Sequence, residues 1–235
     1  MTTRIDEIAP QIFRIATDVA IPGAGGGFSF NQYLVAADEP VLWHTGPRGL
    51  FEATRGAIAK VLAPERLRWI GFSHYEADEC GALNEFLSIA PNAQPLCGRI
   101  GAMVSIGDVA NKPPRALADG ETLDVGGARL TWYDTPHLPH GWDCGLIFDE
   151  TRKLLFCGDL FTQGGNDHAP IVETDILGPS EAFRQPMDYS AHAPDTRTQL
   201  DRLAALAPET LACMHGSAWR GDGAGLLREL AGRVG

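Results

Sequence analysis

Apolar and polar residues alternate along the first third of the chain in the pattern typical of β-strands. Three such runs cover residues 11–15, 28–35 and 40–43, and a glycine-rich tip at residues 23–27 separates the first two. Apolar residues then recur at helical spacing over residues 49–62. The pattern therefore predicts strands that are followed by a helix.

The remainder of the chain repeats this order of elements. A short apolar strand is predicted at residues 68–72 and a helix at residues 81–89. Further strands and helices are predicted at residues 128–133, 144–148, 154–157, 195–206, 210–214 and 226–234. This alternation predicts an α/β (α+β) fold, an αββα sandwich of two packed mixed sheets with helices on the outer faces. We expect residues 1–235 to form a single domain.

One long stretch, residues 160–194, lacks a clear period and contains four prolines. A connection of this length inside a compact domain is usually either a functional loop or a disordered segment. We interpret it as a cover over a site.

Composition and charge narrow the class of protein. The chain is 44% hydrophobic and 21% charged, as in ordinary globular proteins. Its 30 acidic residues exceed its 19 basic ones, and no basic run is present, which excludes nucleic acid as a partner. No apolar run is long enough for a membrane span, and the N-terminus lacks the layout of a signal peptide. Five cysteines without a C-x-x-C pair favour a reduced, cytoplasmic setting.

The strongest chemical signal follows the predicted strand at residues 68–72. There His74, Glu76, Asp78 and Glu79 lie within six positions, directly before a helix. Three carboxylates at the end of a buried strand repel one another unless a cation offsets their charge. An acidic helix N-terminus, which suits the helix dipole, would account for Asp78 and Glu79 but not for the other two. The cluster therefore favours a metal-binding loop.

Three later segments carry further candidate ligands. The sequence T-P-H-L-P-H-G-W-D contains His137 and His140, F-C-G-D-L-F contains Asp159, and C-M-H-G-S-A-W-R contains His215. With the H-x-E-x-D loop and its following C-G-A-L, these segments resemble the metallo-β-lactamase fold over roughly residues 30–220. The glutamate of that loop resembles the di-iron branch, which comprises flavodiiron proteins and stand-alone oxygen-binding di-iron proteins. Hydrolytic zinc members more often have histidine there.

The resemblance implies two metal ions held by the following side chains: His74, Glu76 and His140 at the first ion, Asp78, Glu79 and His215 at the second, and Asp159 as a bridge between them. His140 is preferred to His137 because its spacing from Asp159 fits the di-iron branch without a gap. His137 is then a neighbouring or substitute ligand. No catalytic side chain is expected beyond the metal ligands.

Two positions depart from the pattern of the branch. Glu79 stands where histidine is usual, so it either binds the second ion or turns away and leaves that ion weak or absent. His44 stands where the superfamily tends to have aspartate before Thr-Gly, so it either orients a ligand or is a partly exposed loop residue. Trp219 follows His215 closely and is expected to pack beside the site.

Mixed imidazole and carboxylate ligands predict iron, with zinc and manganese as alternatives. The resemblance implies a non-heme di-iron centre that binds or reduces dioxygen or nitric oxide. A non-catalytic oxygen sensor and a metal-dependent hydrolase of esters, thioesters or lactones are the alternatives. The flavodoxin domain of flavodiiron proteins has no counterpart in these residues, so no FMN is expected in this chain. Electrons would come from a separate donor protein, and the resemblance also implies a homodimer.

Overall fold

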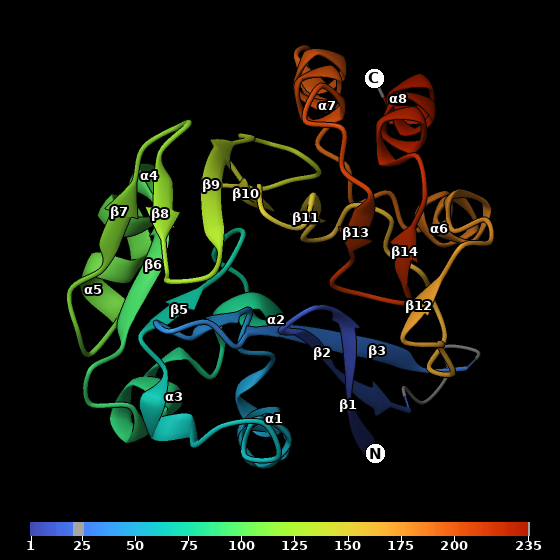
Figure 1. Cartoon of the computed structure of the whole chain (residues 1–235). Helices are drawn as coiled ribbons and strands as arrows, with labels where there is room; N and C mark the ends of the chain where they lie inside the picture. The colour runs from blue at the N-terminus through green and yellow to red at the C-terminus, as the bar shows by residue number, and fades with distance from the viewer. Residues whose placement is uncertain (21–25, 235) are drawn as a thin grey trace.

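The strands pair into two mixed sheets that face each other (Figure 1). The computed structural model describes residues 1–20 and 26–234, so most of the predicted tip at residues 23–27 lies outside the described residues. The first sheet contains, in spatial order, β1 (Thr2–Ala9), β2 (Ile12–Val19), β3 (Phe28–Val35), β4 (Val41–Trp43), β5 (Trp69–Gly71), β6 (Gln94–Gly98) and β7 (Arg115–Leu117). The second contains β12 (Ile171–Val172), β14 (Ala218–Arg220), β13 (Thr210–Ala212), β11 (Leu154–Phe156), β10 (Gly145–Asp149), β9 (Arg129–Asp134) and β8 (Thr122–Asp124).

Helices cover the outer faces of both sheets (Figure 1). They are α1 (Phe51–Ile58), α2 (Ala77–Cys80), α3 (Leu83–Ile89), α4 (Arg99–Gly101), α5 (Gly107–Val109), α6 (Leu177–Arg184), α7 (Thr196–Ala204) and α8 (Gly223–Val234), with helical turns η1 (Arg48–Leu50), η2 (Pro64–Arg66) and η3 (Ala102–Ile106). In Figure 1, α1 and α3 lie below the first sheet, and α7 and α8 lie above the second. Within the described ranges, no helix is long and apolar enough to cross a bilayer.

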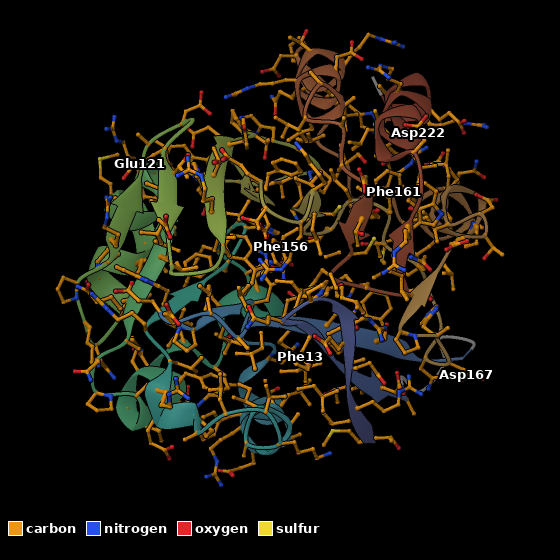
Figure 2. All side chains as sticks on the ribbon, in the orientation of Figure 1. Phe13, Glu121, Phe156, Phe161, Asp167 and Asp222 are labelled. Carbon is orange, nitrogen blue, oxygen red and sulfur yellow. The ribbon has the colours of Figure 1, made fainter. Side chains whose placement is uncertain are left out.

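Three buried clusters hold these layers together. Between the sheets, Trp43 packs against Trp132 and Phe156, with ring centroids 6.3 and 6.0 Å apart. Phe156 lies in the middle of the molecule in Figure 2. A second cluster joins the outer face of the first sheet to α1 and α3, and a third joins the second sheet to α6, α7 and α8. The αββα sandwich is confirmed.

Several elements differ from the sequence prediction. β1 and β6 to β8 were not predicted, and the helix predicted at residues 49–62 ends at Ile58. Residues 160–194, where no periodic element was predicted, contain α6 and the short strand β12. Helix α6 begins because the Asp175 carboxylate accepts the backbone N–H groups of Leu177 and Gly178, at 2.8 and 3.0 Å.

The fold places four loops at one edge of the sandwich. These loops follow β5, β9, β11 and β13, so each leaves the carboxyl end of a strand. Such ends are where ligand sites form in sheets of this kind. Two backbone hydrogen bonds join the sheets there. The N–H of Gly145 donates to the carbonyl of Ser73, and the N–H of Asn31 donates to the carbonyl of Met214, both at 2.9 Å. The candidate ligands of the sequence analysis lie in these four loops, except for Asp78 and Glu79, which lie in the short helix α2 after the first loop.

Candidate metal centre

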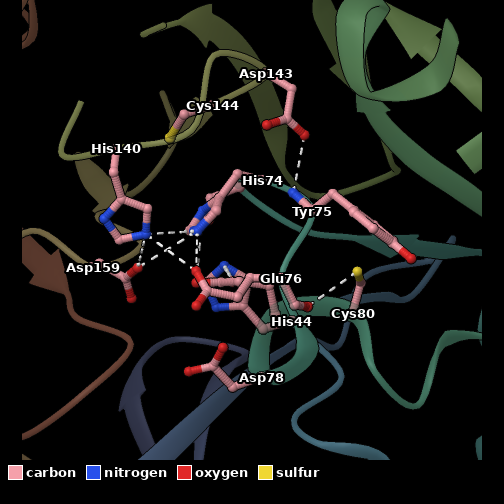
Figure 3. Close-up of polar contacts among 12 residues, drawn as sticks. His44, His74, Tyr75, Glu76, Asp78, Cys80, His140, Asp143, Cys144 and Asp159 are labelled. Carbon is pink, nitrogen blue, oxygen red and sulfur yellow. Dashed lines mark hydrogen bonds and ion pairs between the residues drawn. The ribbon is translucent and has the colours of Figure 1, made fainter. Parts of the chain in front are cut away.

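The first group of donors consists of His74, Glu76, His140 and Asp159, whose ligand atoms all lie within 4.8 Å of one another. Glu76 Oε2 is 2.9 Å from His74 Nε2 and 3.1 Å from His140 Nε2. Asp159 Oδ2 is 3.3 Å from His140 Nε2 and 3.6 Å from His74 Nε2. Figure 3 shows these side chains pointing at a common centre. The loops after β5, β9 and β11 therefore supply one convergent set of nitrogen and oxygen atoms.

The second group shares Asp159 with the first. His215 Nε2 lies 3.3 Å from Asp159 Oδ1 and 3.4 Å from Asp78 Oδ2. Asp159 thus turns one carboxylate oxygen toward each group. Its Oδ1 is buried and makes no hydrogen bond with any described residue. A buried carboxylate oxygen of this kind is unfavourable unless a charge compensates it, and a carboxylate placed in this way can bridge two cations.

Each imidazole turns its Nε2 toward the centre because its Nδ1 is engaged elsewhere. His215 Nδ1 donates to the carbonyl of Ser29 at 2.8 Å, and His140 Nδ1 donates to that of Tyr189 at 3.1 Å. His74 Nδ1 lies 3.0 Å from the Ser73 hydroxyl. A proton held on Nδ1 leaves the lone pair of Nε2 available for a metal. The three histidines are therefore oriented as ligands.

The electrostatics of the group favour a bound cation. Hydrogen bonds from His140 and His74 lower the pKa of Glu76 to about 2. Burial alone would lower the pKa of His215, but Asp159 and Asp78 outweigh it and raise that pKa to about 10. Burial alone would raise the pKa of Asp159, but the same histidines bring it below its usual range. The site stabilises positive charge on its imidazoles and negative charge on its carboxylates.

The structure separates the other predicted residues from this centre. His137 is exposed, so it is His140 that reaches the donor group. Glu79 is fully buried and faces His44, with Oε2 2.6 Å from His44 Nε2, so it lies outside the convergent group. Trp219 lies on β14 and donates its indole N–H to the carbonyl of Thr174 at 3.0 Å. It does not line the cavity at the centre.

That cavity brings in residues that sequence reasoning missed. It has a volume of about 160 Å³, and its apolar wall comprises Phe28, Phe183, Met187 and Tyr189. The Phe28 ring packs against the imidazole of His215 with centroids 4.2 Å apart. Three of these residues belong to the segment at residues 160–194, so the interpretation of that segment as a cover agrees with its position. The absence of a hydrophobic period in this segment was the only sign of its role in the sequence. That sign does not reveal which of its side chains line the cavity.

The residues present fit a pair of cations. Three imidazole nitrogens and the carboxylates of Glu76, Asp78 and Asp159 face one edge of the fold, and Asp159 Oδ1 lacks a hydrogen-bond partner in the described part of the chain. Imidazole with carboxylate is a donor set that iron, manganese and zinc accept.

Known sequences are similar to this chain over most of its length. The sequence model described as "ODP family beta lactamase" matches residues 28–216. The chain is 28% identical over 204 residues to the rubredoxin-oxygen oxidoreductase of Megalodesulfovibrio gigas, covering 83% of this chain and 50% of that protein. It is 27% identical over 205 residues to the anaerobic nitric oxide reductase flavorubredoxin of Enterobacter sp. strain 638, covering 83% and 42%. The chain thus spans about half the length of these curated relatives.

Solved structures agree on the fold. The rubredoxin oxygen:oxidoreductase of Desulfovibrio gigas superposes with a TM-score of 0.81 at 20% identity, over 97% of this chain and 62% of that one. The flavodiiron protein of Giardia intestinalis gives 0.82 at 19% identity, over 99% and 59%. With the family match over most of its length, the chain belongs to the ODP family of beta lactamases, in the di-iron branch of the metallo-β-lactamase fold.

Proposed function

We propose that this chain holds a non-heme di-iron centre that binds or reduces dioxygen or nitric oxide. The observation that carries the proposal is the carboxylate of Glu76 between His74 and His140, at 2.9 and 3.1 Å from their Nε2 atoms. Added carboxylate donors favour harder ions such as iron and manganese over an imidazole-rich zinc site. The names of the relatives, an oxygen oxidoreductase and a nitric oxide reductase, support the same activity.

The cavity supports a small substrate. Its volume of about 160 Å³ is below the roughly 300 Å³ at which sites for larger organic ligands begin. Phe28 and Phe183 make part of its wall apolar, which suits a neutral diatomic molecule. The apolar wall and the small volume therefore support gas binding.

The residues of the chain have separate tasks in this proposal. His74, Glu76 and His140 would hold one ion, Asp78 and His215 the other, and Asp159 both. When bound, the iron pair supplies positions for a diatomic ligand and electrons for its reduction. The carbonyls of Ser29 and Tyr189 fix two of the imidazoles, and Phe28 keeps water from the face of His215.

The setting and partners of the chain are part of the proposal. Relatives named for rubredoxin support a separate protein as the electron donor. All five cysteines are buried free thiols, which fits the cytoplasm. A core shared by both sheets supports a single domain over residues 1–235. Homodimer formation stays a prediction from the family resemblance.

Elemental analysis of protein purified from iron-replete cells tests the function. We expect two iron ions per chain and a near-ultraviolet absorption that changes on reduction and again on exposure to air or nitric oxide. Zinc alone, with an optical spectrum that neither treatment alters and with turnover of model esters, would contradict the proposal in favour of a hydrolase.

A further inference from the structure

The two positions that depart from the family pattern contact each other. His44 Nε2 and Glu79 Oε2 are 2.6 Å apart, and both side chains have an exposed fraction of 0%. A buried carboxylate is strongly unfavourable unless an opposite charge or a shared proton compensates it. The imidazole of His44 is the partner in contact with Glu79, although within the described residues neither carboxylate oxygen nor either ring nitrogen meets hydrogen-bond geometry. The two residues therefore form one buried unit.

The backbone holds this pair in place. Thr45 donates its backbone N–H to the carbonyl of Glu79 at 2.8 Å, and Ala82 donates to the carbonyl of Gly46 at 3.2 Å. His44 itself has a φ of +62°, a left-handed conformation that few residues other than glycine adopt. Such a conformation persists only where its surroundings enforce it. The segment after β4 is thus fastened to α2, with the imidazole in contact with the carboxylate of Glu79.

The pair lies behind His74, on the side away from the donor group. Glu79 Oε1 is 4.0 Å from His74 Nδ1, the nitrogen that does not face Glu76. Ser73 Oγ is 3.0 Å from the same nitrogen. The carboxylate of Glu79 therefore lies on the Nδ1 side of a candidate ligand.

We propose that Glu79 and His44 are positioning residues: Glu79 binds no metal, and the pair holds His74 with its Nε2 toward the first ion. Carboxylates behind a ligating histidine commonly fix its tautomer and raise its strength as a donor. His44 in turn keeps the carboxylate of Glu79 from turning toward the second ion. The inference rests on the dinuclear centre of the proposed function but not on the gas that it binds.

Titration with cobalt(II) tests the proposal, using its visible absorption and competition with a chelator. The variants are His44→Asn, Glu79→Gln and the double variant, with Glu85→Gln on α3 as a matched control. Glu85 lies in the next helix and pairs with Arg48 instead. We expect every variant to bind two cobalt ions at saturation. One dissociation constant should rise about 10- to 100-fold in both single variants. The double variant should show no further loss of cobalt affinity, because each single variant already breaks the same pair. The control variant should bind cobalt as the parent does.

Three results would overturn the inference. If Glu79→Gln saturates at one cobalt ion while His44→Asn binds as the parent does, Glu79 is a ligand. If both single variants melt earlier but keep the parent's affinities, the pair only stabilises the fold. If the parent protein itself binds fewer than two cobalt ions, the dinuclear centre of the proposed function is contradicted. That result is distinguishable from the other two, because it does not depend on any variant.

Discussion

Asp159 is the side chain on which both donor groups depend. It is 7% exposed, and its two carboxylate oxygens face different histidines. It lies three residues after the end of β11, so the end of that strand positions its backbone. A ligand that belongs to both groups cannot be replaced by water at one ion without altering the other.

Replacing Asp159 with alanine should therefore remove both metals, whereas His137→Ala should retain them. His137 is exposed and outside the donor group, so it serves as the control histidine. Metal per chain, measured by plasma mass spectrometry after gel filtration, gives the comparison. The reverse order of loss would show that the ligand assignment is wrong.

At the scale of single residues, the sequence predicts which residues are candidate ligands better than it predicts where their side chains point. The donors that converge, such as His74 and Asp159, were predictable because each follows a strand in a recognisable motif. The orientation of Glu79 was not, since its partner His44 lies in another segment and only the folded chain brings them together. The acceptor for His215 is a backbone carbonyl, that of Ser29, which leaves no trace in the sequence.

Helix α6 and the residues after it cover the mouth of the centre. Phe183 stacks on Phe28 with centroids 5.4 Å apart, and Met187, 58% exposed, lies at the rim of the cavity. Residues 185–188 after α6 are exposed, so this part of the cover is among the less stable parts of the structure. Access to the metals should depend on it.

Removal of either apolar side chain should speed the extraction of metal by a chelator. Met187→Ala and Phe183→Ala widen the opening without touching a ligand, and Met187→Ala should change the stability by no more than about 0.5 kcal/mol. The rate of metal loss to excess EDTA, followed optically, measures this. Met103→Ala on η3 is the control, since Met103 is 73% exposed and does not line the cavity. Equal rates in all of these variants would mean that the metal leaves by another route.

The elements that sequence patterns missed are short or lie at an edge of a sheet. β7 and β8 have three residues each, too few to show an alternating pattern. β1 is an edge strand with mostly half-buried positions, so its alternation is weak. α6 contains Gly178 and Pro179 in its first turn, a place where proline is tolerated but where a sequence reading expects a loop.

At the scale of the whole molecule, the centre joins the two sheets. His74 and Asp78 follow β5 of the first sheet, whereas Asp159 and His215 follow strands of the second. Ions bound between them would link both halves at one edge, while the cluster around Phe156 links them in the interior. The unfolded chain does not bring these donors together, so it does not bind the metal ions at this centre. The free energy of metal binding therefore adds directly to the folding stability.

Metal should therefore raise the melting temperature, and by more at higher pH. At a free ion concentration of 100 times Kd the gain is about 2.7 kcal/mol, or about 5–10 °C for a chain of this size. In the metal-free chain the pKa of His215 is raised from 6.5 to about 10. Its stabilising effect is thus complete below pH 6.5 and is lost as pH rises toward about 10. The carboxyl of Glu76, with its pKa lowered to about 2, stays ionised throughout that window and adds no slope.

A cation that binds the imidazole must displace its proton, so metal affinity also increases across the same window. Both effects have the same sign. Calorimetric melting with chelator-buffered zinc, at pH 6.5 and at pH 9, should show the larger metal-induced shift at the higher pH, and His137→Ala should behave as the parent does. A shift that is equal at both pH values would mean that the metal displaces no proton from the imidazoles of the centre, His215 included.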